Sequence, residues 1–172
     1  MKNRSDSLSY HSVVTPELVQ TIRDQYAIDW QGIHGIDHFR RVRENGLKVA
    51  QLTGAVPAVV ELFAFLHDSK RINDSRDPGH GLRGAAFAKE LKGSLLFLND
   101  HEFDLLVYAC EHHTDGKTEG DITVQTCWDA DRLDLWRASI WPKEEYLCTE
   151  AARSPAMIQW ASSRIPGMQA PD

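Results

Sequence analysis

Histidine and aspartate residues recur in this sequence at positions where helices are expected to start, end or turn inward. His34 and His38 are four residues apart, so on a helix they would share a face. Imidazole together with carboxylate suits divalent Mn, Fe, Zn, Ni or Co better than Ca, which prefers oxygen ligands alone. The sequence therefore predicts a transition-metal site. The further candidates are the adjacent His67 and Asp68, then His80, the pair His112 and His113, and Asp129 with Asp131.

No single member of this series is specific, because an isolated His-Asp pair more often marks a helix end than a site. Burial is the stronger indication. His67 and Asp68 directly follow the apolar run 63–66, and Asp131 has Trp128 and Leu135 at helical spacing. A lone carboxylate in such a place would carry a large desolvation cost and would tend to neutralise. A divalent ion removes that cost.

The elements that must position these residues are helices. Thr15 and Pro16 are typical of a helix start, and Asn99 or Asp100 is expected to cap a later one. No strongly alternating strand is present, so we expect an all-α, single-domain helical bundle of about six or seven helices. The expected helices start at residue 16 and then cover 36–54, 57–66, 80–91, 99–113, 123–136, 142–152 and 154–164.

Composition limits the function classes. The 172 residues suit one domain, which we place at 15–165, between a flexible N-terminus (1–14) and a flexible tail (166–172). A net charge of −6 argues against a nucleic-acid-coating protein. Three cysteines without a CxxC pair favour a reducing compartment. With no signal-peptide pattern, and with Glu61 inside the longest apolar stretch, we expect a cytoplasmic protein that does not contact membranes.

Three motifs in order resemble the HD-domain superfamily of metal-dependent phosphohydrolases, in particular its short stand-alone members. They are His38-Phe39-Arg40-Arg41-Val42, then His67-Asp68, then Asp131-Arg132-Leu133-Asp134, and together with His34 they cover most of the chain. Some of these short proteins are nucleotide pyrophosphohydrolases. The resemblance implies an all-α bundle, in agreement with the helical pattern. It also implies four metal ligands: His38, His67, Asp68 and Asp131.

Two further matches extend the resemblance. His80 lies in a His-Gly-Leu-Arg-Gly-Ala segment, and His112-His113 is similar to the paired histidines of HD-GYP phosphodiesterases and binuclear HD enzymes. The Gly-Tyr-Pro triplet is missing, and Ser69-Lys70 replaces the usual Ile-Gly-Lys, which argues against cyclic-di-GMP hydrolysis. The centre therefore holds one or two ions. His80 and His112 either complete a second metal position with Asp68 as the bridge, or lie near the substrate. His113 is interpreted as a cation that offsets the helix dipole.

The expected function is hydrolysis of a phosphate ester or anhydride, in a nucleotide or related small molecule, by a metal-activated water. Asp68, His80 and His112 are the predicted catalytic residues. Lys70, Arg83 and Arg132 are predicted to bind substrate and offset its charge, whereas Arg71 and Arg76 are interpreted as solvated. His34 is either a substrate or ligand-supporting contact or a plain loop histidine. Asp129 either orients a ligand histidine or is an exposed acid.

Two alternatives keep the same residues. The first is a di-iron oxygenase of the HD type, for which the six residues His38, His67, Asp68, His80, His112 and Asp131 would serve as ligands. Iron content with dioxygen consumption separates it from a hydrolase. The second is a non-catalytic nucleotide-sensing module, which would bind a nucleotide tightly without forming product.

Overall fold

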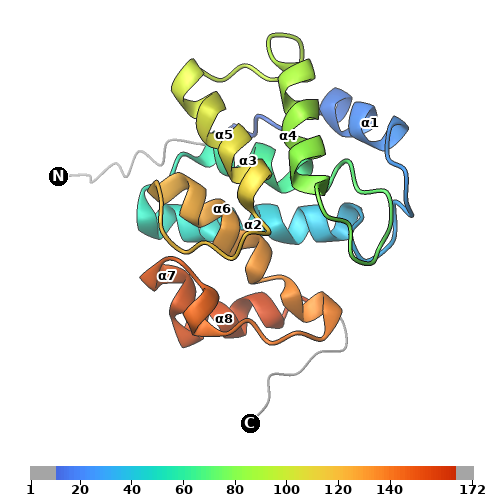
Figure 1. Ribbon diagram of the computed structural model, residues 1–172. Coiled ribbons are helices and arrows are strands. Elements are labelled where there is room, and N and C mark those ends of the chain that lie inside the picture. The colour runs from blue at the N-terminus through green and yellow to red at the C-terminus, as the bar shows by residue number, and fades with distance from the viewer. Residues whose placement is uncertain (1–10, 166–172) are drawn as a thin grey trace, which may run out of the picture.

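Residues 11–165, which the computed structural model describes, form a bundle of α-helices without a β-strand (Figure 1). The all-α prediction is confirmed. No helix in this part of the chain has the length and apolar character needed to span a bilayer. The helices of residues 11–165 are α1 (Pro16–Asp24), α2 (Ile36–Thr53), α3 (Pro57–Leu66), α4 (His80–Leu91), α5 (Asp100–His112), α6 (Ile122–Arg132), α7 (Glu150–Arg153) and α8 (Pro155–Ser162), with the short 3₁₀ helices η1 (Leu135–Ala138) and η2 (Glu144–Tyr146).

Local capping explains where several helices begin and end. The side chain of Thr15 accepts a hydrogen bond from the Leu18 amide at 3.1 Å, and Pro16 occupies the first position of α1. Asn99 and Glu102 form a reciprocal capping box at the start of α5. Gly54 adopts a left-handed conformation, φ 76°, and ends α2. These starts and stops follow the sequence pattern.

The apolar helix α3 lies at the centre of the main core. Each of its residues from Val59 to Leu66 is buried, and the helix packs against α2, α5 and α6 (Figure 1). A second, smaller core lies below, where Leu133 and Trp136 pack with residues of α7 and α8. Within residues 11–165 there are therefore one main core and one small core, and the small core is built largely by the C-terminal part of this range.

Two glycines let α4 approach its neighbours closely. A Cβ atom on Gly84 would lie 2.6 Å from the carbonyl oxygen of Leu66 and 2.9 Å from that of His67. A Cβ atom on Gly81 would lie 2.5 Å from the carbonyl oxygen of Cys110. Only glycine permits these contacts, because backbone atoms cannot yield as side-chain ends do. The first turns of α4 are therefore pressed against the ends of α3 and α5.

The C-terminal third differs from the prediction. The helix expected at 142–152 is replaced by η2 and α7, separated by extended chain at Leu147. The reason is Asp129, whose buried carboxylate accepts hydrogen bonds from the amides of Cys148 (2.5 Å) and Thr149 (2.9 Å). Those amides are therefore not available for a continuous helix. The helix expected at 123–136 likewise ends at Arg132, and η1 follows.

Part of the segment expected to be flexible is in contact with the core. The amide of Val13 donates a hydrogen bond to the buried carboxylate of Glu61 at 3.0 Å, and Val13 and Val14 pack against the main core. Val13 and Val14 therefore contact the core, although they fall in the segment expected to be flexible. The rest of that segment, 1–10, and the expected tail, 166–172, lie outside the described residues.

Candidate metal centre

Six side chains from five helices or their ends converge at one place between α2, α3 and α4. His38 is the third residue of α2, and His67 and Asp68 directly follow the end of α3. The other three are His80, the first residue of α4, His113, which follows the end of α5, and Asp131, near the end of α6. Their ligand atoms form three overlapping groups with the spacing that a metal ion requires: His38, His67 and Asp68; His67, His113 and Asp131; Asp68, His80 and His113.

One part of this centre, which we call the inner half, consists of His38, His67 and Asp131. The Nε2 atoms of His38 and His67 are 3.1 Å apart. Asp131 Oδ1 lies 3.5 Å from the first and 3.6 Å from the second. The ring of each histidine is fully buried. Two imidazole nitrogens and a carboxylate oxygen therefore face a common point.

The outer half consists of His80 and His113, whose Nε2 atoms are 2.8 Å apart. Asp68 joins the two halves, because its carboxylate oxygens point in different directions. Oδ1 lies 3.0 Å from His80 Nε2 and 3.6 Å from His113 Nε2. Oδ2 lies 3.6 Å from His38 Nε2 and 3.7 Å from His67 Nε2. The two carboxylate oxygens of Asp68 thus face different halves of the centre.

The hydrogen bonds of the opposite ring nitrogens fix the orientation of all four histidines. His67 Nδ1 lies 3.0 Å from the Phe63 carbonyl oxygen, His80 Nδ1 2.6 Å from that of Asp77, and His113 Nδ1 2.7 Å from that of Cys110. A carbonyl oxygen only accepts, so each Nδ1 carries the proton, and in a neutral ring Nε2 then bears a lone pair. His38 Nδ1 lies 2.7 Å from a carboxylate oxygen of Asp134, with the same consequence.

The lone pairs of His38 and His67, and likewise those of His80 and His113, therefore face each other within hydrogen-bond distance, beside two carboxylates. Such an arrangement repels itself unless a cation lies between the acceptors. Asp131 Oδ1 adds to this picture, because it is buried and has no hydrogen-bond partner among residues 11–165. A divalent transition ion satisfies both requirements, and the mixed imidazole and carboxylate donors match that class of ion. The residues present fit a metal.

Electrostatics within the centre lead to the same conclusion. Burial, reinforced by the positive charge of Arg137, lowers the pKa of His38 to about 4, so this ring is neutral near pH 7. Burial would also lower the pKa of His67, but the charges of Asp68 and Asp131 raise it above its ordinary value. Burial would raise the pKa of Asp68, yet the surrounding His67, His113 and His80 rings hold it well below its usual range. The centre attracts positive charge.

Three arginines surround the centre. Arg71 Nη1 lies 3.2 Å from His80 Nε2 and 3.5 Å from Asp68 Oδ1, so this guanidinium contacts the outer half. On the other side, Asp134 accepts from Arg41 Nε at 2.6 Å and lies 3.8 Å from Arg137 Nη1. The prediction that Arg71 is merely solvated does not hold, since only a small fraction of its side chain is exposed.

The paired histidines require a correction. His113, not His112, contributes to the centre. His112 lies instead at the surface, where Nδ1 forms an ion pair with Asp115 Oδ2 at 2.7 Å. Helical spacing could have distinguished His113 from His112. Phe103, Leu106 and Cys110 line the buried face of α5, and the next position on that face is 113.

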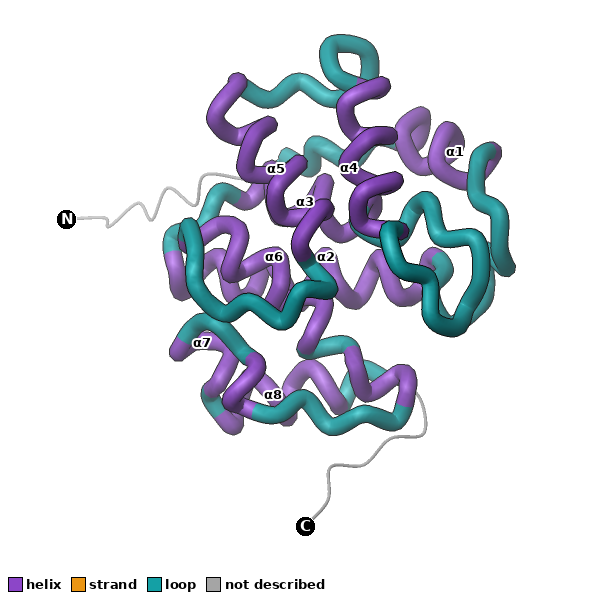
Figure 2. The backbone as a smooth tube through the Cα atoms, viewed as in Figure 1, coloured by secondary structure: helices purple, strands orange, loops and turns teal. Residues whose placement is uncertain are grey.

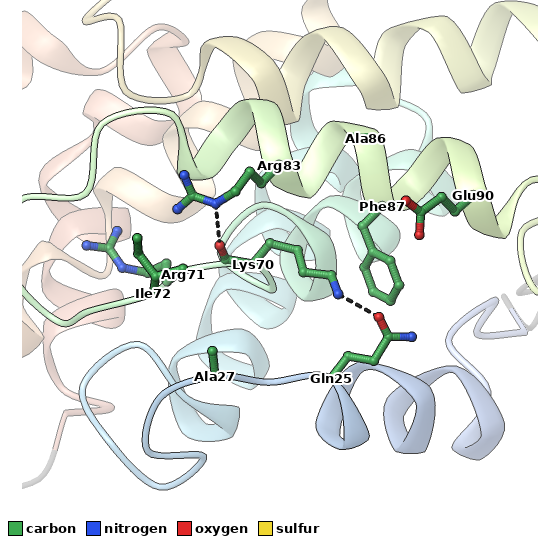
Figure 3. Close-up of a pocket in the computed structure, with 9 residues that line it drawn as sticks. All are labelled: Gln25, Ala27, Lys70, Arg71, Ile72, Arg83, Ala86, Phe87 and Glu90. Carbon is green, nitrogen blue, oxygen red and sulfur yellow. Dashed lines mark hydrogen bonds between the residues drawn. The ribbon is translucent and has the colours of Figure 1, made fainter.

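Three predicted substrate-binding residues are directed elsewhere. Lys70 donates to Gln25 Oε1 at 2.6 Å, in a pocket on the far side of its loop (Figure 3). Arg83 binds both carboxylate oxygens of Asp77, at 2.6 and 2.7 Å. Arg132 donates to the carbonyl oxygens of Tyr146 and Lys117, both at 2.7 Å, so it joins η2 to the α5–α6 loop.

His34 lies beside the centre but contacts none of its ligand atoms by hydrogen bond. Its ring centroid is 6.4 Å from that of His38, and its Nδ1 is 3.0 Å from Asp74 Oδ1. This contact joins the α1–α2 loop to the α3–α4 loop, which lie side by side in Figure 2. His34 therefore holds together the two loops that flank the site.

The acid that orients a ligand histidine is Asp134 rather than Asp129. Asp129 is buried and accepts from the amides of residues 148 and 149 and from the Thr149 hydroxyl, so its role is structural. Asp134 was part of the third motif but had no predicted role. It lies about one helical turn beyond Asp131 and directly before η1, where helical spacing alone does not reveal the direction of its side chain.

Neither a protein-family model, nor a curated protein, nor a solved structure matches this chain.

Proposed function

We propose that this protein is a metal-dependent phosphohydrolase of the HD type, which cleaves a phosphate ester or anhydride in a nucleotide or related small molecule. The six side chains of the centre would hold the metal: His38, His67 and Asp131 in the inner half, His80 and His113 in the outer half, and Asp68 between them. Bound there, a divalent ion would act as a Lewis acid toward a phosphoryl oxygen and lower the pKa of a bound water.

The charge balance of the centre is the observation that carries this proposal. Asp68 is paired with Arg71, and Asp134 is paired with Arg41 and Arg137, whereas Asp131 has no guanidinium in contact and is attracted by Arg137 only over a longer distance; three carboxylate charges therefore face three guanidinium charges. A divalent ion would add positive charge without compensation from the protein. An anionic substrate group would offset it, and the dianionic phosphoryl group is the best match. The carboxylates are Asp68, Asp131 and Asp134, and the guanidiniums are Arg41, Arg71 and Arg137.

The protein's own groups have separable roles in this proposal. Arg71 is the cation nearest to the outer half, and its N–H groups would donate to a phosphoryl oxygen and stabilise charge as it develops. The Asp134 carboxylate and three backbone carbonyls would hold the four imidazoles in position. The burial of Asp68 and of both inner histidines would exclude bulk water.

The division of Asp68 between the halves favours two ions over one. Each of its oxygens faces a different pair of imidazoles, which is the arrangement expected of a bridging carboxylate. With a single ion, the inner half would be the better site, because it has the additional carboxylate of Asp131.

The alternatives make different use of the same residues. A di-iron oxygenase acting on an organic substrate would not require three guanidiniums around its ligands, and a sensing module would not require a buried, fully oriented ligand set. We therefore rank hydrolysis of a phosphate substrate first.

The test is metal analysis of the purified protein combined with a phosphate-release screen over nucleotides and small phosphoesters. We expect bound transition metal and release of phosphate or pyrophosphate. The adjacent histidines provide matched variants: His113→Ala should lower the metal content and activity, whereas His112→Ala should change neither. Metal-free protein, or equal effects of the two variants, would contradict the proposal. Dioxygen consumption with iron, without phosphate release, would favour the oxygenase.

A further inference from the structure

A pocket of about 290 Å³ lies beside the loop that carries Lys70 and Arg71 (Figure 3). It is bounded by the chain after α1, by this loop and by the outer face of α4. Its walls are mostly apolar and include Ala27, Ile72 and Ala86. None of the six proposed metal ligands lines it, so the pocket is separate from the centre.

One cation in this pocket lacks an anionic partner. Lys70 Nζ donates to the neutral amide oxygen of Gln25 at 2.6 Å and lies 4.0 Å above the ring centroid of Phe87. Among residues 11–165 no carboxylate forms an ion pair with it, although Glu90 also lines the pocket and attracts it over a longer distance.

The other two cations that line the pocket are Arg71, which is paired with Asp68, and Arg83, which is also neutralised. Arg83 binds both oxygens of Asp77, and its Nε donates to the carbonyl oxygen of Lys70 at 2.9 Å. Its guanidinium therefore forms part of the wall. Lys70 remains as the cation to which a ligand can bind without breaking an ion pair.

We propose that this pocket binds a small organic carboxylate. The carboxylate would accept a hydrogen bond from Lys70 Nζ in exchange for Gln25, and a short or flat apolar body would lie against Ile72 and Ala86. A neutral amide is a weaker partner for an ammonium than a carboxylate, so the exchange is favourable. The volume is at the small end for ligand pockets and fits a body the size of one aromatic ring.

The position of the pocket makes its occupant a regulator of the outer half. Arg83 connects the Lys70 carbonyl to Asp77, and the carbonyl of Asp77 orients His80. Arg71, which contacts Asp68, follows Lys70 directly. A ligand that draws Lys70 away from Gln25 would therefore act on Arg71 and on the Asp77 carbonyl that orients His80. This regulatory consequence rests on the proposed metal centre, whereas binding of the carboxylate does not.

Benzoate is the probe that we would use, titrated into the full chain with its metal as purified and followed by amide chemical shifts. We expect saturable binding in the millimolar range or tighter, with shifts at residues 70–72 and 83–87. Lys70→Met keeps the side-chain stem and removes the charge. Gln25→Glu leaves Lys70 in place and gives it an internal carboxylate. Each variant should weaken binding by about tenfold, whereas Lys89→Met, on the exposed side of α4, should not.

Three results would overturn the proposal: no saturable shift with benzoate, equal binding by Lys70→Met, or equal binding of benzylamine, which has the opposite charge. Bound benzoate should also change the affinity of the centre for its metal by about fivefold or more. If benzoate binds and that affinity stays constant, the regulatory role is refuted and the carboxylate site stands. Because binding is read from chemical shifts, its failure is distinguishable from absence of phosphohydrolase activity.

Discussion

The two halves of the centre use the same ligand types but are supported differently. In the inner half, His67 is oriented by a backbone carbonyl, but His38 is oriented by the carboxylate of Asp134, which Arg41 holds in place. In the outer half, His80 and His113 are oriented by backbone carbonyls, and the neighbouring charge is the guanidinium of Arg71.

The difference shows how one protein can build a strong and a weaker cation site side by side. A carboxylate behind an imidazole increases its basicity more than a neutral carbonyl does, and Asp131 adds a second negative ligand to the inner half. In the outer half, a protein cation already donates to the histidine lone pair. We therefore expect the inner half to bind metal tightly and the outer half to exchange it more readily.

The largest effect is expected from the residue that the halves share. Asp68→Ala should abolish metal binding in both halves and all phosphohydrolase activity, because each half loses a carboxylate ligand. Metal content by elemental analysis and phosphate release measure this, and circular dichroism checks that the helices remain. A variant that retains full turnover would show that Asp68 is not a ligand.

Asp134→Asn should separate the halves. Loss of the carboxylate behind His38 should weaken metal binding in the inner half by about 10- to 100-fold, with a smaller effect on the outer half. Competition with a chelator gives the affinity of each ion. Asp129→Asn is the matched control, since it should lower thermal stability through the 148–149 loop and leave metal affinity unchanged. Equal loss from both halves would mean that their supports are not independent.

Arg71→Gln should affect substrate more than metal. Removal of the guanidinium beside the outer half should reduce kcat/KM for a phosphate substrate by about tenfold, as expected for one charge-assisted hydrogen bond. Metal content should be retained. Arg76→Gln, an exposed arginine of the same loop, serves as the comparison and should have no effect. A loss of metal in the Arg71 variant would instead indicate a structural role.

Gly84→Ala should produce the smallest change and confine it to the outer half. The added methyl group would meet the backbone oxygens of Leu66 and His67, so α4 and His80 should shift, with a loss of about 1–3 kcal/mol in unfolding free energy. Thermal unfolding and metal stoichiometry are the measurements. Leu82→Ala, on the exposed side of the same helix, should leave both nearly unchanged. Loss of inner-half metal would contradict the assignment.

Much of the fold was predictable because the long helices carry continuous apolar stripes and recognisable caps, as at Thr15 and Asn99. The 142–152 segment was not, because a buried carboxylate from another helix, Asp129, determines its conformation. No local pattern records such a contact.

The site was predictable to the extent that its residues lie on helices. His38 and His67 follow from their place on buried faces, and His113 could have been found by continuing the stripe of Leu106 and Cys110. The roles of the cationic loop residues Lys70 and Arg71 could not be predicted in this way, because the directions of their side chains depend on tertiary contacts and not on helical periodicity.

The small C-terminal core has a consequence for the inner half. Leu133 and Trp136, on either side of Asp134, are anchored in this core with residues of α7 and α8. The last helices supply no ligand, yet they hold the segment that orients His38. We therefore expect that a proteolytic cut between η1 and α7 would inactivate the centre while every ligand residue stays covalently intact.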